Sequence, residues 1–252
     1  MRTYVRLVQH TKIGRIKMII NEIDKFGICI QQGDYIFTGY KSKYNCNNKH
    51  IHVEKYYGNL NLTVTSKLVR NFNELGFISS ANINDYYEEI IKNCPYSFSF
   101  ETLINSPVYW VDVKKDVLNN TGFSNQDVIS VLREKSYLTT TKNETPSFDK
   151  NKGYEDSLLI KPTTKSVNDS IEIYCKVKEI TQNKWDYPDY YENFSEDWLI
   201  ENENILRFER RLQKTKDIKN AFKLNLLRRV TILDIFDSEI DVVKEYVRAK
   251  FM

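Results

Sequence analysis

The chain has 252 residues, and its 37 Lys and Arg side chains only slightly outnumber its 34 Asp and Glu side chains, for a formal net charge of +3 at pH 7. This length allows a sizeable core, and the low charge excludes DNA binding through a general field, so that such binding needs a local basic patch. Four scattered cysteines without Cys-x-x-Cys spacing indicate neither a zinc site nor a disulfide scaffold, and the lack of a long apolar run predicts a cytoplasmic protein without a membrane span.

The first third of the chain favours short strands with turns between them. Turns are predicted at Gly14, Gly27 and Gly33. The predicted strands are residues 4–8, 16–20, 27–31 and 35–38, followed by strands near His50 and Leu60. Two helices are expected next, at residues 82–92 and 124–135, because Asn82 or Asn84 caps the first and Ser124 caps the second.

A strand at residues 108–113 reads Val-Tyr-Trp-Val-Asp-Val. It places one carboxylate, Asp112, inside an otherwise apolar run. A carboxylate in such surroundings needs a partner or a metal ion. Two interpretations therefore stay open, namely an ion pair with an arginine of another strand and a ligand of a divalent ion.

Predicted strands at residues 138–145 and 157–161 lead to the most informative segment, residues 169–179, where apolar and polar residues alternate without a break. Such alternation is the side-chain period of a strand. One face carries Ile171, Ile173, Cys175 and Val177, and the other carries Glu172, Tyr174, Lys176 and Lys178. A phenol flanked by cations suits a nucleophile, because the cations lower its pKa and hold a phosphate. A half-buried strand with a solvated charged face is the alternative.

The aromatic and acidic segment 184–196 is predicted to pack over the sheet edge, because its acids oppose the phosphates of any base that its rings could stack. Residues 205–212 are predicted to form a strand with Glu209 between Arg207 and Arg211, whose guanidinium groups suit phosphate recognition. The rest is mainly helical, and its basic run favours a phosphate track over a merely solvated face. The run contains Arg207, Arg210, Arg211, Lys214, Lys216, Lys219, Lys223, Arg228 and Arg229.

These segments, in this order, resemble the replication initiators of filamentous phages and their plasmid relatives, the gene II/X family. The family's Tyr-x-Lys-x-x-Glu pattern is similar to Tyr174, Lys176 and Glu179, and its Arg-x-Glu-x-Arg strand with a following basic helix is similar to residues 206–212 and 214–223. Order and spacing carry the resemblance from about residue 61 onward. Further likenesses are residues 62–72 with Lys67, residues 110–112 and residues 231–237.

The resemblance implies an origin-specific nickase for rolling-circle replication. Tyr174 would attack a DNA phosphate and stay joined to the 5′ end, so that the phosphotyrosine bond conserves the energy for rejoining, and Lys176 would assist. A divalent ion, Mg²⁺ or Mn²⁺, would polarise the phosphoryl oxygens, with Asp112 and Glu209 as its ligands. The implied partners are origin DNA, single-stranded or supercoiled, and host helicase and polymerase in a bacterial cytoplasm. The implied DNA contacts are Arg207, Arg211, Lys214 and Lys67.

A rival set of metal ligands is His50-Ile51-His52, which has the His-hydrophobic-His form found in the wider superfamily of tyrosine nucleases. On a strand both imidazoles project from one face, alongside Glu54. Paired histidines in a polar strand also occur without a metal, so both interpretations stay open.

The predicted fold class is α+β, a mostly antiparallel sheet with helices packed on one side, as in an HUH/Rep-like nuclease. The chain is expected to form a single initiator domain, residues 1–252, with a β-rich half at 1–105 and a catalytic half at 106–252. The main alternative function is a non-catalytic DNA-binding regulator of replication related to the initiator. A structural or interaction protein with ordinary strands is a third hypothesis.

Overall fold

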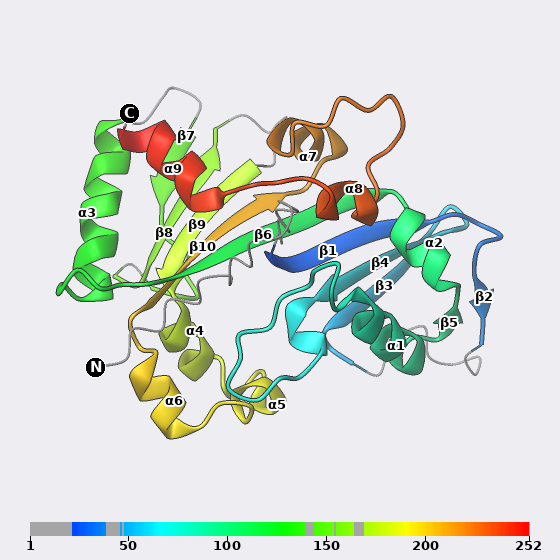
Figure 1. Cartoon of the computed structure of the whole chain (residues 1–252), viewed down its shortest axis with the longest axis horizontal. Coiled ribbons are helices and arrows are strands. Elements are labelled where there is room, and N and C mark those ends of the chain that lie inside the picture. The colour runs from blue at the N-terminus through cyan, green and yellow to red at the C-terminus, as the bar shows by residue number, and fades with distance from the viewer. Residues whose placement is uncertain are drawn as a thin grey trace, which may run out of the picture.

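The computed structural model describes residues 22–38, 46, 48–139, 144–153, 155–163 and 169–251, so the strands predicted at 4–8 and 16–20 lie outside the described residues. An eight-stranded antiparallel sheet runs through the molecule (Figure 1). From one edge to the other its strands are β3 (Ile51–Tyr56), β4 (Asn59–Thr65), β1 (Glu22–Ile30), β6 (Val108–Leu118), β10 (Ile205–Leu212), β9 (Asp169–Cys175), β8 (Ser157–Pro162) and β7 (Glu144–Ser147). A second, two-stranded sheet pairs β2 (Ile36–Phe37) with β5 (Tyr96–Ser97).

The large sheet joins strands from both halves of the chain. β1 pairs antiparallel with β4 on one side and with β6 on the other. β10 in turn pairs antiparallel with β6 and β9. The three strands that carry the sequence motifs, β6, β10 and β9, are therefore adjacent, and residues far apart in the chain meet across them.

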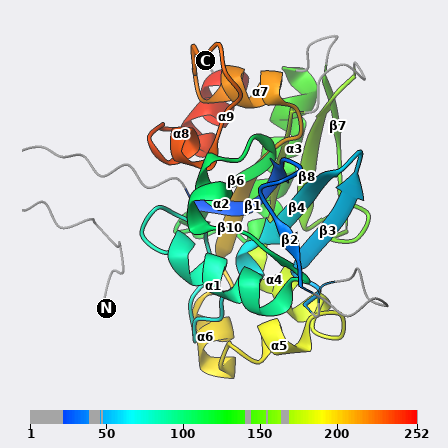
Figure 2. The same ribbon diagram turned by 90° about the vertical axis from the view of Figure 1, so that its right-hand side faces the viewer.

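Helices cover one face of this sheet, with α1, α2, α8 and α9 on the same side (Figure 2). Helices α4, α5 and α6 gather at one end (Figure 1). Within the part of the chain that is described, none of the helices combines the length and the apolar character that crossing a membrane requires. The helices are α1 (Ile83–Asn93), α2 (Phe100–Asn105), α3 (Asn125–Leu138), α4 (Lys176–Gln182), α5 (Pro188–Tyr191), α6 (Glu196–Glu201), α7 (Thr215–Ala221), α8 (Ile232–Phe236), α9 (Val242–Phe251) and the 3-10 turn η1 (Ser66–Leu68). These elements confirm the predicted α+β class.

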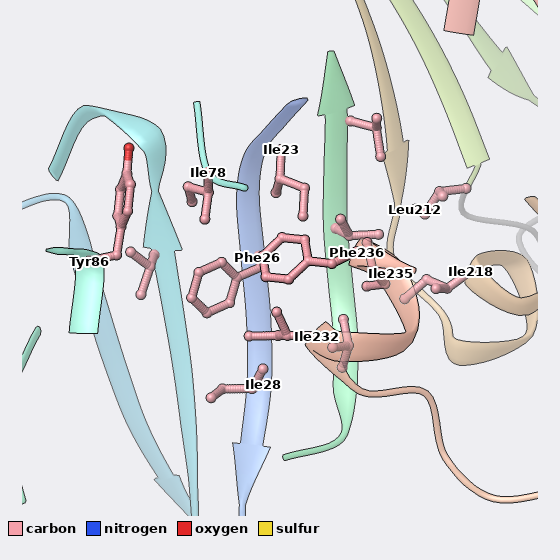
Figure 3. Close-up of a cluster of buried hydrophobic side chains, with 14 of the residues drawn as sticks. Ile23, Phe26, Ile28, Ile78, Tyr86, Leu212, Ile218, Ile232, Ile235 and Phe236 are labelled. Atoms are coloured by element: carbon pink, nitrogen blue, oxygen red, sulfur yellow. The ribbon is translucent and has the colours of Figure 1, made fainter. Parts of the chain in front are cut away.

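The main hydrophobic core lies between the sheet and these helices. Phe26 and Ile28 of β1 belong to it together with Ile232 and Phe236 of α8 (Figure 3). Each fully buried side chain of this kind contributes about 1.5–3 kcal/mol by leaving water. Because side chains alternate along a strand, the same strands turn their polar residues to the opposite face.

The helices predicted from their caps are present. α3 begins after Ser124, whose hydroxyl accepts a hydrogen bond from the amide of Asp127, while the Asp127 carboxylate accepts one from the amide of Ser124. This reciprocal pair satisfies two amides that the first helical turn leaves free. α1 follows Asn82, as predicted, although the Asn82 side chain bonds to Ser79 and Phe77 rather than to the helix.

Two predictions at strand ends were wrong. Gly27 lies inside β1 instead of in a turn. Glycine suits this strand position because a Cβ atom there would meet the Tyr109 ring at 2.8 Å. The strand predicted at 138–145 does not begin at its first residue, since Leu138 still belongs to α3 and β7 begins at Glu144. The strands at 157–161 and 205–212 are confirmed as β8 and β10.

The strand predicted to reach Lys178 ends at Cys175, and α4 begins at Lys176. Val177 and Ile180 are three residues apart, which places them on one side of a helix. They pack there in a second hydrophobic cluster with Tyr190 of α5. The alternation in sequence thus continues past the end of the strand. Residues 176–182 nevertheless form a helix, because Val177 and Ile180 pack in a separate apolar cluster.

Candidate functional site

The polar face of the sheet holds a pocket of about 410 Å³. It lies on the opposite side of β6 and β10 from the main core, because its residues alternate with the core residues Val111, Phe208 and Leu212. Six basic and four acidic side chains line it, so that cations are in excess. The lining residues are Asp24, Lys25, Lys49, His50, Thr65, Lys67, Trp110, Asp112, Lys152, Tyr174, Lys176, Glu179, Tyr187, Glu209, Arg211 and Gln213.

Strand register places the predicted site residues on this face. Arg211 of β10 lies opposite Asp112 of β6, and Arg207 of β10 lies opposite Tyr174 of β9. Directly opposite residues of an antiparallel pair share a face of the sheet. Glu209, two positions from both arginines, therefore lies on the same face as the tyrosine.

Tyr174 and Glu209 form the central contact of the pocket. The Tyr174 hydroxyl donates a hydrogen bond to Oε2 of Glu209 at 3.0 Å. Burial of Tyr174, with the nearby charge of Glu209, raises the pKa of the phenol well above its usual value. This corrects the prediction that neighbouring cations lower the pKa of Tyr174, because burial dominates. The phenol keeps its proton until an acceptor takes it, and Glu209 is the acceptor in contact.

Glu209 is ionised and can therefore accept a proton. Burial alone would raise the pKa of Glu209, but Arg211 and other cations hold it below the ordinary value. Arg211 Nε donates to Oε1 of Glu209 at 2.8 Å. The two carboxylate oxygens of Glu209 thus have different partners, an arginine on one and the tyrosine on the other.

Asp112 is buried beside this pair. Its Oδ1 accepts a hydrogen bond from Trp110 Nε1 at 2.7 Å, and its Oδ2 lies 3.9 Å from Arg211 Nε. Burial and the charge of Glu209 raise the pKa of Asp112 well above its usual value. The predicted ion pair with an arginine of the next strand is therefore present but loose, and Arg211 binds Glu209 more closely.

The donor chemistry of Asp112 and Glu209 fits a hard divalent ion. Mg²⁺ is commonly held by one or two carboxylates together with water and phosphate oxygens. The repulsion that raises the pKa of Asp112 would be relieved by a cation near both carboxylates. No cluster of three or more His, Cys, Asp or Glu side chains suited to a metal occurs among the described residues, so the substrate would have to complete the coordination.

Lys176 and Lys67 share one carboxylate at the wall of the pocket. Lys176 Nζ lies 2.6 Å from Glu179 Oε2, and Lys67 Nζ lies 3.4 Å from Glu179 Oε1. The two lysines hold the pKa of Glu179 well below its usual range against the opposing effect of burial. Lys176 is thus near Tyr174, as predicted, although it reaches the pocket from a helix.

Lys152, in the turn between β7 and β8, was missed from the sequence. Its Nζ lies 3.8 Å from the centre of the Tyr174 ring and 2.5 Å from Glu172 Oε1. Burial raises the pKa of Glu172 to about 7, although Lys152 and Arg211 act against it. No pattern around Lys152 marks it, since a turn lysine is ordinary in isolation and only the fold brings it over the tyrosine.

Arg207, which the sequence predicts to contact DNA, is buried and bound by carboxylates of the protein itself. Its side chain is 1% exposed, and Nε and Nη2 bind the two oxygens of Asp116 at 2.6 and 2.7 Å. Nη1 binds Asp24 at 3.0 Å. All of this guanidinium group's strong contacts are with carboxylates of β6 and β1, so that it fastens three strands together.

The C-terminal basic run does not form one continuous track. Arg211 lines the pocket, whereas Arg210 points to the helix side and binds Asp169 at 2.5 Å and Glu245 of α9. Arg228 pairs with Asp234 at 2.6 Å. Lys214, just before α7, is not among the residues that line the pocket.

The two histidines of the rival ligand set lie in different surroundings. His50 is buried and lines the pocket, where its ring stacks on Tyr187 with centroids 5.5 Å apart. Burial, with the charges of Lys67 and Lys49, lowers the pKa of His50 to about 4. His52 is exposed on β3 and does not line the pocket. The segment 184–196 thus reaches the site through Tyr187.

Comparison with known protein families, curated proteins and solved structures finds no match to this chain.

Proposed function

We propose that the pocket binds the backbone of DNA and that Tyr174 cuts one strand of it, as in the initiators of rolling-circle replication. The observation that carries this proposal is the hydrogen bond from Tyr174 to Glu209 within a pocket rich in cations. A nucleophile needs a base within hydrogen-bonding reach, and a phosphodiester needs positive charge around it. The order of motifs resembling the gene II/X initiators supports DNA as the substrate.

In the proposed step, the Tyr174 oxygen forms a bond to phosphorus while the bond from phosphorus to the 3′ oxygen breaks. The phenol proton passes to Oε2 of Glu209, and the 3′ oxygen leaves and takes a proton from water. The 5′ phosphate stays on Tyr174. Since one phosphodiester replaces another, the reverse step rejoins the strand without an added energy source.

The remaining side chains hold charge near this phosphate. Lys176 and Arg211 line the pocket and would stabilise the additional negative charge of the transition state. Asp112 and Glu209 would hold a Mg²⁺ or Mn²⁺ ion, which when bound would polarise a phosphoryl oxygen. In this proposal Asp112 acts only through the ion, whereas Glu209 also receives the proton.

A second function is favoured by the burial of the tyrosine. Tyr174 is only 3% exposed, and Lys152 lies over its ring. A phosphate must enter the pocket to reach the Tyr174 hydroxyl. If the phosphate never reaches this hydroxyl, the protein would bind DNA without cutting it. It would then be a non-catalytic regulator of replication.

Supercoiled DNA that carries a rolling-circle origin tests the two functions. The protein is incubated with it and Mg²⁺ or Mn²⁺, and detergent then removes noncovalently bound protein. The nickase produces open circles with protein attached to the 5′ end. Retarded but uncut circles would support the regulator, and circles that are neither bound nor cut would contradict both.

A further inference from the structure

Among the described residues, four of the five lysines that line the pocket come from separate parts of the chain and lie over tyrosine rings. Lys49 precedes β3, Lys67 lies in η1, Lys152 lies in the turn between β7 and β8, and Lys176 begins α4. No two of them are close in sequence, so their meeting is a product of the fold. Four ammonium groups repel one another, and such a gathering needs compensation from other groups.

Tyrosine rings lie between these lysines at the end of the pocket where Lys49 is exposed. Lys49 Nζ lies 4.7 Å from the centre of the Tyr187 ring, and Lys67 Nζ lies 4.6 Å from the same ring. Lys67 Nζ also lies 5.0 Å from the centre of the Tyr190 ring. Each contact is within the range in which a cation is attracted to an aromatic face.

The pattern continues to the proposed nucleophile. Lys176 Nζ lies 5.7 Å from the Tyr190 ring centre and 6.0 Å from that of Tyr174. Lys152 Nζ lies on the Tyr174 ring at 3.8 Å. Lysines and tyrosines therefore alternate from Lys49 to Lys152, and we call these four lysines the lysine row.

The two ends of the lysine row differ in how well acids neutralise them. Lys152 and Lys176 make close ion pairs, at 2.5 Å with Glu172 and 2.6 Å with Glu179. Lys67 reaches Glu179 only at 3.4 Å, and Lys49 is exposed and bonds to the backbone carbonyl of Asp186. Among the described residues, positive charge is thus least compensated by acids at Lys49 and Lys67, the outer end of the row.

We infer that the lysine row binds the phosphates of single-stranded DNA, which enters at Lys49 and Lys67 and is led to Tyr174. The inference rests on the proposed function for the identity of the ligand. A pocket of about 410 Å³ is too small for a duplex. Proteins that bind single strands combine a basic groove with aromatic side chains, and both are present here. This track replaces the C-terminal run as the principal path of the strand.

The test measures binding alone, with fluorescence anisotropy of a short labelled oligodeoxythymidine over a range of salt concentrations and without a divalent ion. The pocket variant is Lys49→Gln with Lys67→Gln. The control is Lys216→Gln with Arg229→Gln, which removes the same charge from two exposed residues outside the pocket. A duplex and an RNA of the same sequence compete against the labelled strand.

The pocket variant is expected to bind on the order of tenfold more weakly and to lose about 0.7 of the salt slope for each phosphate contact removed, while the control binds like the wild type. Equal losses in both variants, no loss in either, no binding by the wild type, or preference for duplex or RNA would each overturn the inference. Binding that depends on the lysine row in a protein that never nicks would keep the track and refute only the nickase.

Discussion

The Tyr174 hydroxyl donates to Glu209 across the β9–β10 pair, although neither residue lies directly opposite the other. Tyr174 pairs with Arg207 and Glu209 pairs with Glu172, so the hydrogen bond runs diagonally over the sheet. A tyrosine is long enough to span this diagonal. The contact fixes the phenol against an ionised carboxylate, and the proposed chemistry depends on it.

Glu209→Gln tests whether this carboxylate accepts the proton. The amide keeps the size of the side chain and still accepts a hydrogen bond, but it does not take up a proton. Covalent adduct formation should slow by about 10²–10⁴-fold, the usual contribution of a general base. Glu196→Gln is the control, because Glu196 is exposed and does not line the pocket. A Glu209→Gln rate near that of the wild type would remove Glu209 from this role.

His50 should make stability depend on pH. Its pKa is lowered from 6.5 to about 4 in the folded protein, chiefly by burial. Between these values the unfolded chain binds a proton at His50 that the folded protein does not, so the free energy of unfolding falls as the pH falls from 6.5 to 4. Urea unfolding over this window should give a flatter pH dependence for His50→Gln than for the wild type or for the exposed control His52→Gln. Parallel curves for all three would show that His50 does not contribute.

Arg207 should matter for stability and not directly for DNA contact. Arg207→Met leaves Asp116 and Asp24 without their guanidinium partner and should cost about 3–5 kcal/mol in the free energy of unfolding. Arg228→Met removes the exposed pair with Asp234 and should cost far less. If Arg207→Met kept its stability and lost affinity for DNA, the original prediction of a DNA contact would be restored.

The alternation of residues allowed much of the site to be predicted. In β10 it placed Arg207, Glu209 and Arg211 on one face, and in β9 it placed Glu172 and Tyr174 on one face, as the structure has them. Such a pattern depends only on neighbours in the chain, and so a single sequence contains it.

Long-range pairing was not predictable in the same way. The alternation indicates that Arg207 faces the polar side of the sheet. It does not indicate that Asp116 and Asp24, on other strands, bind Arg207 there. Lys49 and Lys152 belong to loops, where no periodicity marks a residue. The start of α4 at Lys176 depends on an apolar cluster that forms only in three dimensions.

The metal requirement distinguishes the two sets of candidate ligands. Asp112→Asn should raise the concentration of Mn²⁺ that supports half-maximal nicking, because it weakens one of two carboxylate donors. His52→Gln should leave that concentration unchanged, since His52 lies outside the pocket. The reverse result, a higher Mn²⁺ requirement with His52→Gln and an unchanged one with Asp112→Asn, would assign the ion to the histidine pair instead.

The central claim is that Tyr174 becomes joined to DNA, and mass spectrometry of the digested adduct tests it most directly. The wild type should carry a nucleotide on the peptide that contains Tyr174. Tyr174→Phe should remain folded and form no adduct, because only the hydroxyl is lost, while Tyr191→Phe should react like the wild type. An undiminished adduct with Tyr174→Phe, or a nucleotide on Tyr190 or Tyr191, would contradict the assignment of Tyr174 as the nucleophile.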